Sequence, residues 1–203
     1  MNAMLDWLPI ASAVFAVPQF LPQLVRLSRT GDAAGVSWSW AALTSISNGG
    51  WIAYFALSGF WTSLVPAGSV TALAGVLAGL LSRRAGVTRR QAVITAAWAG
   101  ILAIAGAIGG RVGLGTVLTA SFVLQVTPSV WTAYRTERPT GIARGTWWLI
   151  LGELVCWGAY GQYQSDPRLI VLGWTGVTAS LLMLARAHTA RNGHRRRPAP
   201  RQT

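Results

Sequence analysis

The stretch that decides the fold runs from Pro18 to Tyr54 and reads PQFLPQLVRLSRTGDAAGVSWSWAALTSISNGGWIAY. Pro18 and Pro22 lie inside an apolar run, and a short loop ending in Gly35-Val36-Ser37 leads into a second apolar run. Proline is tolerated in membrane helices, where neighbouring helices or water satisfy the freed backbone groups. The stretch therefore predicts two membrane-crossing helices joined by a short polar loop.

The composition extends this interpretation to the whole chain. Of its 203 residues, 52% are hydrophobic and 11% are charged, whereas a soluble domain usually carries about 25% charged residues. Several apolar runs reach the ~20 residues that a membrane helix needs. We expect an all-α membrane protein with seven transmembrane helices, at approximately 6–27, 37–58, 61–82, 91–109, 113–134, 146–164 and 167–187.

The arginines predict the orientation of the chain. All seventeen basic residues are Arg, and fifteen of them lie at the end of the first, third, fifth or seventh span or in the segment that follows it. Arg111 and Arg168 lie on the opposite side. Because basic residues stay on the cytoplasmic side, we expect a multi-pass cell-membrane protein with its N-terminus outside and its C-terminus in the cytoplasm. This placement accounts for the net charge of +12 without nucleic acid as a partner.

The C-terminal tail, the single cysteine and the two histidines are the remaining candidates for ligand contacts. The Arg-rich tail, residues 188–203, is expected to be disordered; it could contact anionic lipid headgroups or act only as a topology signal. Cys156 is the only cysteine, and both histidines lie in the tail. No Cys/His cluster has metal-ligand spacing, so we expect neither a metal nor a cofactor.

A shift of 106 residues aligns the two halves of the chain without gaps. The identical pairs are Gln19/Gln125, Pro22/Pro128, Arg29/Arg135, Thr30/Thr136, Gly35/Gly141, Leu43/Leu149, Trp51/Trp157, Ala53/Ala159 and Tyr54/Tyr160. Three spans in each half and one between them make the two copies parallel, which is typical of transporters with a midplane substrate site. We expect two parallel triple-helix bundles, at 5–82 and 113–187, joined by a linker helix at 83–112.

The motifs of the first half resemble those of the PQ-loop repeat proteins. They are Pro22-Gln23 followed by Arg26, then Gly35-Val36-Ser37, then Trp51-Ile52-Ala53-Tyr54. The second half is degenerate and reads Pro128-Ser129, Gly141-Ile142-Ala143 and Trp157-Gly158-Ala159-Tyr160. The arrangement of three, one and three spans is similar to the SWEET sugar transporters.

This resemblance implies alternating access between the bundles, with hinges at Pro18, Pro22, Gln23 and Pro128. It also implies a pocket for a small solute at the bundle interface. Trp51 and Trp157 match a pocket tryptophan of the sugar-carrying relatives. Their pocket asparagine, in the third helix, does not carry over, because Ala67 or Gly68 and Gly173 or Trp174 stand at the corresponding places.

Glu153 is the only acidic residue in the interior of a predicted span. A charge there costs at least ~2.5–3.5 kcal/mol on insertion scales, so the carboxyl must face the interior, be protonated or have a partner. Its equivalent in the first half is Ser47, beside Asn48. We predict that Asn48, Trp51, Glu153 and Trp157 bind substrate. Glu153 could also carry a coupled proton or only bond a neighbouring helix, Asn48 could join helices, and the tryptophans could be interfacial anchors.

The sequence thus favours a transporter that moves a small polar solute, a sugar or similar, by alternating access, either facilitative or proton-linked. The alternative is a membrane receptor or accessory protein on the same scaffold, because a fold does not fix a function. An enzyme is not expected, since Glu153 has no intramembrane His, Asp or reactive Cys to complete a catalytic set. The expected partners are the solute and the bilayer, and oligomers stay open.

Overall fold

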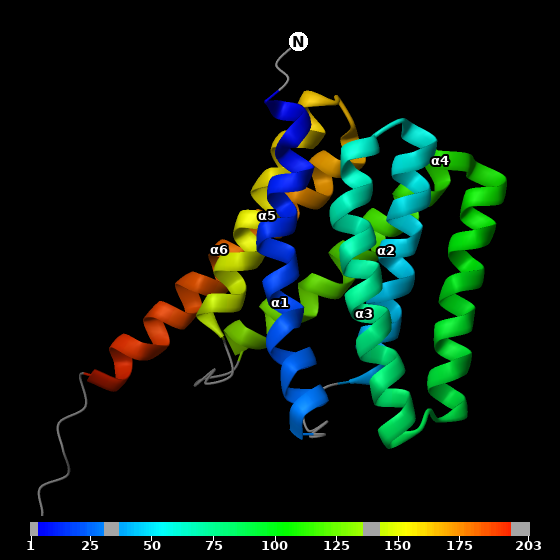
Figure 1. Cartoon of the computed structure of the whole chain (residues 1–203). Coiled ribbons are helices and arrows are strands. Elements are labelled where there is room, and N and C mark those ends of the chain that lie inside the picture. The colour runs from blue at the N-terminus through cyan, green and yellow to red at the C-terminus, as the bar shows by residue number, and fades with distance from the viewer. Residues whose placement is uncertain (1–3, 31–36, 136–142, 196–203) are drawn as a thin grey trace, which may run out of the picture.

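The computed structural model describes residues 4–30, 37–135 and 143–195, and helices dominate this part of the chain (Figure 1). Six α-helices and two short 3-10 turns follow one another in this part, so the all-helical fold class is confirmed. In chain order they are η1 (Leu5–Trp7), α1 (Leu8–Thr30), α2 (Trp38–Ser58), η2 (Trp61–Ser63), α3 (Leu64–Ala85), α4 (Arg89–Arg135), α5 (Arg144–Tyr163) and α6 (Pro167–Arg195).

Within the described residues, four helical stretches are long and apolar enough to cross a membrane: Leu5–Thr30, Trp61–Arg84, Arg89–Arg135 and Pro167–Thr189. The remaining helices, α2 and α5, have 21 and 20 residues. They match the ~20 residues of a span in length, but their tryptophans and polar residues lower the mean hydropathy. The predicted count of seven spans is therefore not confirmed and stays a prediction.

The 47-residue α4 consists of two helical arms joined at Gly110. Gly110 has φ 54° and ψ −146°, a conformation that glycine reaches without a steric penalty from Cβ. In Figure 1 the green helix turns sharply here, and its second arm then runs toward α6. The arms, 89–109 and 111–135, fall at two of the predicted spans.

The motif that precedes α2 caps this helix. Ser37 has an extended backbone, and its side chain accepts a hydrogen bond of 3.3 Å from the backbone N–H of Trp40. A serine at this position satisfies one of the free N–H groups of the first turn. Its equivalent before α5 is Ala143, which has no side-chain cap. The neighbouring motif residues Gly35-Val36 and Gly141-Ile142 lie outside the described residues.

Helix packing joins the two halves of the chain in a matched way. The helix α1 packs on α3 and α5, α2 packs on α3 and α4, and α6 packs on α4 and α5. The pairs α1–α5 and α2–α4 therefore cross between the halves, as a two-fold relation of the repeats requires. A buried core near the end of α2 draws on both halves and includes Tyr54, Phe55, Leu118, Trp157 and Tyr160. The predicted bundle boundaries remain a prediction.

The C-terminal tail begins later than the sequence predicted. Residues 188–195, expected to be disordered, continue α6 as helix to Arg195. Neighbouring helices hold this end, because Arg144 Nη2 donates to the Ala187 carbonyl at 2.6 Å and Arg186 Nε donates to the Ala133 carbonyl at 3.1 Å. Alanine and arginine are also good helix formers. Residues 196–203 of the predicted tail lie outside the described residues.

The four predicted hinge residues lie within helices. Pro18, Pro22 and Gln23 belong to α1, and Pro128 belongs to the second arm of α4. Each proline removes one backbone donor from its helix. The side-chain oxygen of Gln23 is buried and has no hydrogen-bond partner in the described part of the chain. Their movement as hinges stays a prediction.

Candidate functional site

A cavity of about 170 Å³ lies where the two halves meet. It brings together the four residues predicted to bind substrate, Asn48 and Trp51 from α2 and Glu153 and Trp157 from α5. Helices α2 to α6 all contribute to its wall, which also includes Phe55, Pro66, Ala67, Val70, Phe122, Leu154, Leu169 and Leu172. Substrate binding by these residues stays a prediction, but their convergence defines one candidate site.

The polar centre of the cavity is the carboxyl of Glu153. Its Oε2 accepts a hydrogen bond of 2.8 Å from Gln19 Nε2, which also lies 3.2 Å from the carbonyl oxygen of Phe15. The ring of Phe15 covers Gly152, where a Cβ would come within 2.6 Å of the ring atoms. The helix α1 therefore lies directly against α5 beside Glu153.

Gln19 is a site residue that sequence reasoning missed. It follows Pro18 directly and is one of the identities at the 106-residue offset. Its equivalent Gln125 is exposed, and Ser47, the equivalent of Glu153, accepts a hydrogen bond of 3.0 Å from Trp98 Nε1 on the first arm of α4. The Gln19–Glu153 hydrogen bond therefore joins the two halves and has no repeat equivalent, because Gln125 is exposed and Ser47 bonds α4.

Asn48 is the second polar side chain of the cavity. Its Nδ2 donates to the carbonyl oxygen of Thr44, one turn earlier in α2, at 3.0 Å. This hydrogen bond stays within one helix and does not join α2 to a neighbour. The amide is thereby held in place at the cavity wall, where it can bond a polar group of a solute.

Stacked aromatic rings form one side of the cavity. Phe55 stacks on Trp51 with centroids 5.5 Å apart and on Trp157 with centroids 5.2 Å apart, the second pair inclined by only 6°. Phe55 thus links the two repeat-related tryptophans across the halves. Sequence reasoning missed Phe55, because its equivalent is Gly161 and the repeat gives no signal at this position.

The positions of the missing pocket asparagine are apolar in both halves. Ala67 of α3 lines the cavity and is 3% exposed. At Gly173 of α6 a Cβ would come within 2.3 Å of the Gly158 backbone, so no side chain fits between α5 and α6. The cavity therefore has no side-chain amide at either of these positions.

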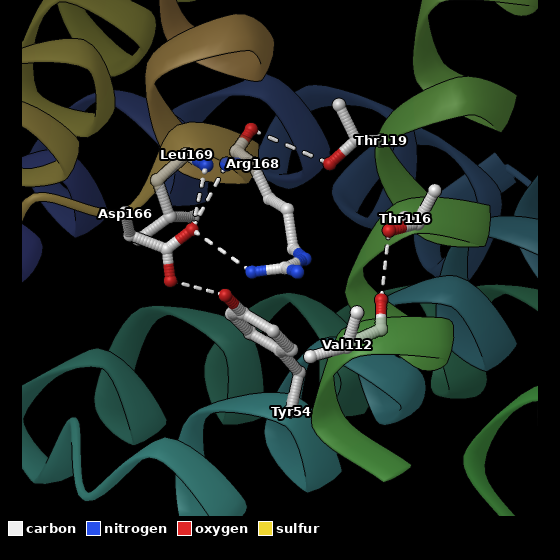
Figure 2. A network of polar contacts seen from close by, with 7 residues as sticks. All are labelled: Tyr54, Val112, Thr116, Thr119, Asp166, Arg168 and Leu169. Atoms are coloured by element: carbon white, nitrogen blue, oxygen red, sulfur yellow. Dashed lines mark hydrogen bonds and ion pairs between the residues drawn. The ribbon is translucent and has the colours of Figure 1, made fainter. Parts of the chain in front are cut away.

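A polar network lies beside one end of the cavity and connects the two halves (Figure 2). The Tyr54 hydroxyl, at the end of α2, donates to Asp166 Oδ2. Asp166 Oδ1 accepts from the backbone N–H groups of Arg168 at 2.9 Å and Leu169 at 3.4 Å. Asp166 therefore caps the N-terminus of α6, with Pro167 favourably placed in the first turn.

The same network includes a cation and a close helix contact. Arg168 Nη1 lies 4.0 Å from Asp166 Oδ1, and Thr119 Oγ1 donates to the Arg168 carbonyl at 3.3 Å. At Gly115 of α4 a Cβ would come within 2.4 Å of Tyr54 and 2.6 Å of Arg168. Sequence reasoning missed Asp166, although an Asp-Pro pair before an apolar run is a helix-start signal.

The repeat explains which residues meet at this end. Phe60 is the equivalent of Asp166, and Tyr160 is the equivalent of Tyr54. The ring of Tyr160 meets Phe60 edge-on, with centroids 5.7 Å apart and an angle of 78°. Each buried tyrosine therefore contacts the corresponding residue of the opposite half, through a hydrogen bond in one case and through ring packing in the other.

Comparison with solved structures identifies the fold. The chain is similar to a structure described as the 3.7 Å resolution structure of a eukaryotic SWEET transporter, with a TM-score of 0.72 and 13% sequence identity over 94% of this chain and 100% of that one. No family model matches the chain, and no curated protein matches it. The SWEET-like fold is confirmed by this likeness, whereas membership of the PQ-loop family is not shown.

Proposed function

We propose that this chain is a membrane transporter that moves a small polar solute by alternating access between its two halves. The observation that carries the proposal is the cavity between the halves, in which Asn48 and Glu153 meet the repeat-related Trp51 and Trp157. Clefts between structural repeats are the usual substrate sites of such transporters. The likeness of the fold to a SWEET transporter supports the same conclusion.

The contacts between the halves indicate the state of the molecule. Tyr54 with Asp166, and Tyr160 with Phe60, join the halves at one end. Toward the other end, described contacts such as Arg186 to Ala133 stay within one half, and α6 runs away from α2 and α3 (Figure 1). The molecule is therefore in a state closed at the Tyr54 end, which the predicted orientation makes the outer end.

Alternating access requires these contacts to separate when the opposite end closes. The prolines within the helices, Pro18 and Pro22 in α1 and Pro128 in α4, are suited to this movement because each removes an intrahelical hydrogen bond. Transport could be facilitative or linked to protons through Glu153. A proton-linked mechanism predicts that an imposed proton gradient drives flux in the unsubstituted protein and not in Glu153→Gln.

Flux in proteoliposomes tests the proposal. Purified protein is reconstituted and screened for uptake of labelled sugars, amino acids, organic acids and amines. Trp157→Ala is expected to reduce uptake of the transported solute, while Trp148→Ala, an exposed tryptophan of the same helix, leaves it unchanged. Absence of uptake for every solute would contradict the proposal, and saturable binding without uptake would instead favour a receptor or accessory protein.

A further inference from the structure

The cavity combines one carboxyl with several aromatic rings, and we propose that its solute is a small organic cation. This inference rests on the proposed transport function and names its substrate class. Glu153 is the single charged residue among the described residues that line the cavity. Four of the others are aromatic, namely Trp51, Phe55, Phe122 and Trp157.

The carboxyl of Glu153 has no cationic partner among the residues that line the cavity. Gln19 donates a hydrogen bond to its Oε2 at 2.8 Å, but a neutral amide supplies no positive charge to balance an ionised carboxylate. Arg168 is the neighbour in sequence of the wall residue Leu169. Its guanidinium is directed to another carboxylate, since Arg168 Nη1 lies 4.0 Å from Asp166 Oδ1. Since an unpaired charge in an apolar interior is costly, a bound ammonium group would complete the site.

The aromatic wall fits the same class of ligand. The faces of tryptophan, and less strongly of phenylalanine, attract cations through the ring quadrupole, and aromatic cages recognise quaternary ammonium groups. Trp51, Phe55 and Trp157 form one continuous stack beside Glu153. Phe55 lies between the two tryptophans, so the ring faces left for a cation are the outer faces of Trp51 and Trp157. An ammonium group bonded to the carboxyl and held against one of these faces would interact with both, while Asn48 could bond a hydroxyl at the other end of the ligand.

The polarity of the cavity argues against a sugar. A volume of about 170 Å³ equals that of roughly six water molecules at ~30 Å³ each, which suits choline or a short alkylamine. A sugar has many hydroxyl groups, and each one buried without a partner is unfavourable. Besides the N–H groups of the tryptophans, the polar side chains of the wall are Asn48 and Glu153. These are too few hydrogen-bonding groups for the hydroxyls of a sugar.

Calorimetric binding to the purified full-length protein tests the proposal. The probes are choline and propylammonium, with 3,3-dimethylbutan-1-ol as the neutral counterpart of choline and glucose as a sugar. We expect saturable binding of at least one cation and at least about tenfold weaker binding of the neutral counterpart. Glu153→Gln is expected to weaken cation binding at least about tenfold, Glu153→Asp to retain part of it, and Asp6→Asn, outside the cavity wall, to leave it unchanged.

Thermal unfolding of each variant checks that the binding change is not a folding defect. The proposal is overturned if neither cation binds, if the neutral counterpart binds equally well, or if a folded Glu153→Gln protein keeps the original affinity for the cation. Flux measurements distinguish a failure of the cation assignment from a failure of the proposed transport function. Uptake of a neutral solute without cation binding would overturn the cation assignment alone, whereas cation binding without uptake would leave the assignment and contradict transport.

Discussion

Tyr54→Phe is expected to loosen the closed end of the molecule while keeping the ring that packs there. The substitution removes the hydroxyl that donates to Asp166 and preserves the contact of the ring with Trp51, whose centroid lies 5.3 Å away. Tyr54 is 1% exposed and Asp166 is 8% exposed, so water screens this hydrogen bond little. Its loss is therefore expected to weaken the closed state.

The magnitude follows from the groups that remain around Asp166. A hydrogen bond to a charged group contributes about 1.5–3 kcal/mol. Asp166 keeps the N–H groups of Arg168 and Leu169 and the nearby guanidinium, so it is not left without partners and the lower half of this range applies. A loss of about 1.5–2 kcal/mol shifts the balance between closed and open states by roughly ten- to thirty-fold.

Chemical labelling measures this shift. In a Cys156→Ser background, Ala67→Cys places a thiol in the cavity wall at a position that is 3% exposed. Its reaction with a membrane-impermeant maleimide, applied from the side of the Tyr54 end, should accelerate by roughly ten- to thirty-fold in Tyr54→Phe. Comparing intact cells with inverted vesicles also tests the predicted orientation.

Tyr160→Phe is the matched control, because its ring is the repeat equivalent of Tyr54 and meets Phe60 in place of a carboxylate. It should leave the labelling rate nearly unchanged. An unchanged rate in Tyr54→Phe would refute a closing role for this hydrogen bond. An equal increase in both variants would show that labelling reports general loosening of the packing and not the loss of one polar contact.

Two glycines give further predictions about stability. Gly173→Ala should destabilise the protein by about 1–3 kcal/mol, because its Cβ would lie 2.3 Å from the Gly158 backbone; thermal unfolding measures this, with Gly145→Ala, which meets open space, as the control. Gly110→Ala should cost roughly 1–3 kcal/mol, because φ 54° and ψ −146° form a backbone conformation that is essentially restricted to glycine. Gly109→Ala, with no close contacts and no positive φ, should be neutral, and an equal effect at both positions would contradict the strain argument.

Much of the architecture could be predicted from the sequence because it depends on patterns that extend over many residues. Long apolar runs and their proline and glycine boundaries indicated where helices begin and end, and α2 begins one residue later than the predicted span. The sharp turn at Gly110 falls in the connection predicted between the spans at 91–109 and 113–134, where Gly109-Gly110 indicated a turn. The end of α6 was placed too early, because arginine richness was taken as a sign of disorder.

The candidate site could be predicted where a residue was unusual for its surroundings or was repeated between the halves. Glu153 stood out as an acid within an apolar run, and the repeat pointed to Trp51 and Trp157. Gln19 and Asp166 were missed for a different reason. Each bonds a partner more than one hundred residues away in the chain, Glu153 for Gln19 and Tyr54 for Asp166. The Asp-Pro pair indicates that a helix starts at this point, but no local pattern indicates either of these contacts.

Comparing equivalent positions in the two halves shows that the polar residues of the site are not repeated. Glu153 replaces Ser47 and Asp166 replaces Phe60 at corresponding positions, so both acids that bond across the halves belong to the second half. Their partners, Gln19 and Tyr54, belong to the first half. The scaffold is therefore repeated while its polar side chains are not, and a solute in the cavity would meet one carboxyl on a single wall. A cavity with this asymmetry can orient a ligand that has one charged end and one neutral end, which a symmetric pair of walls could not do.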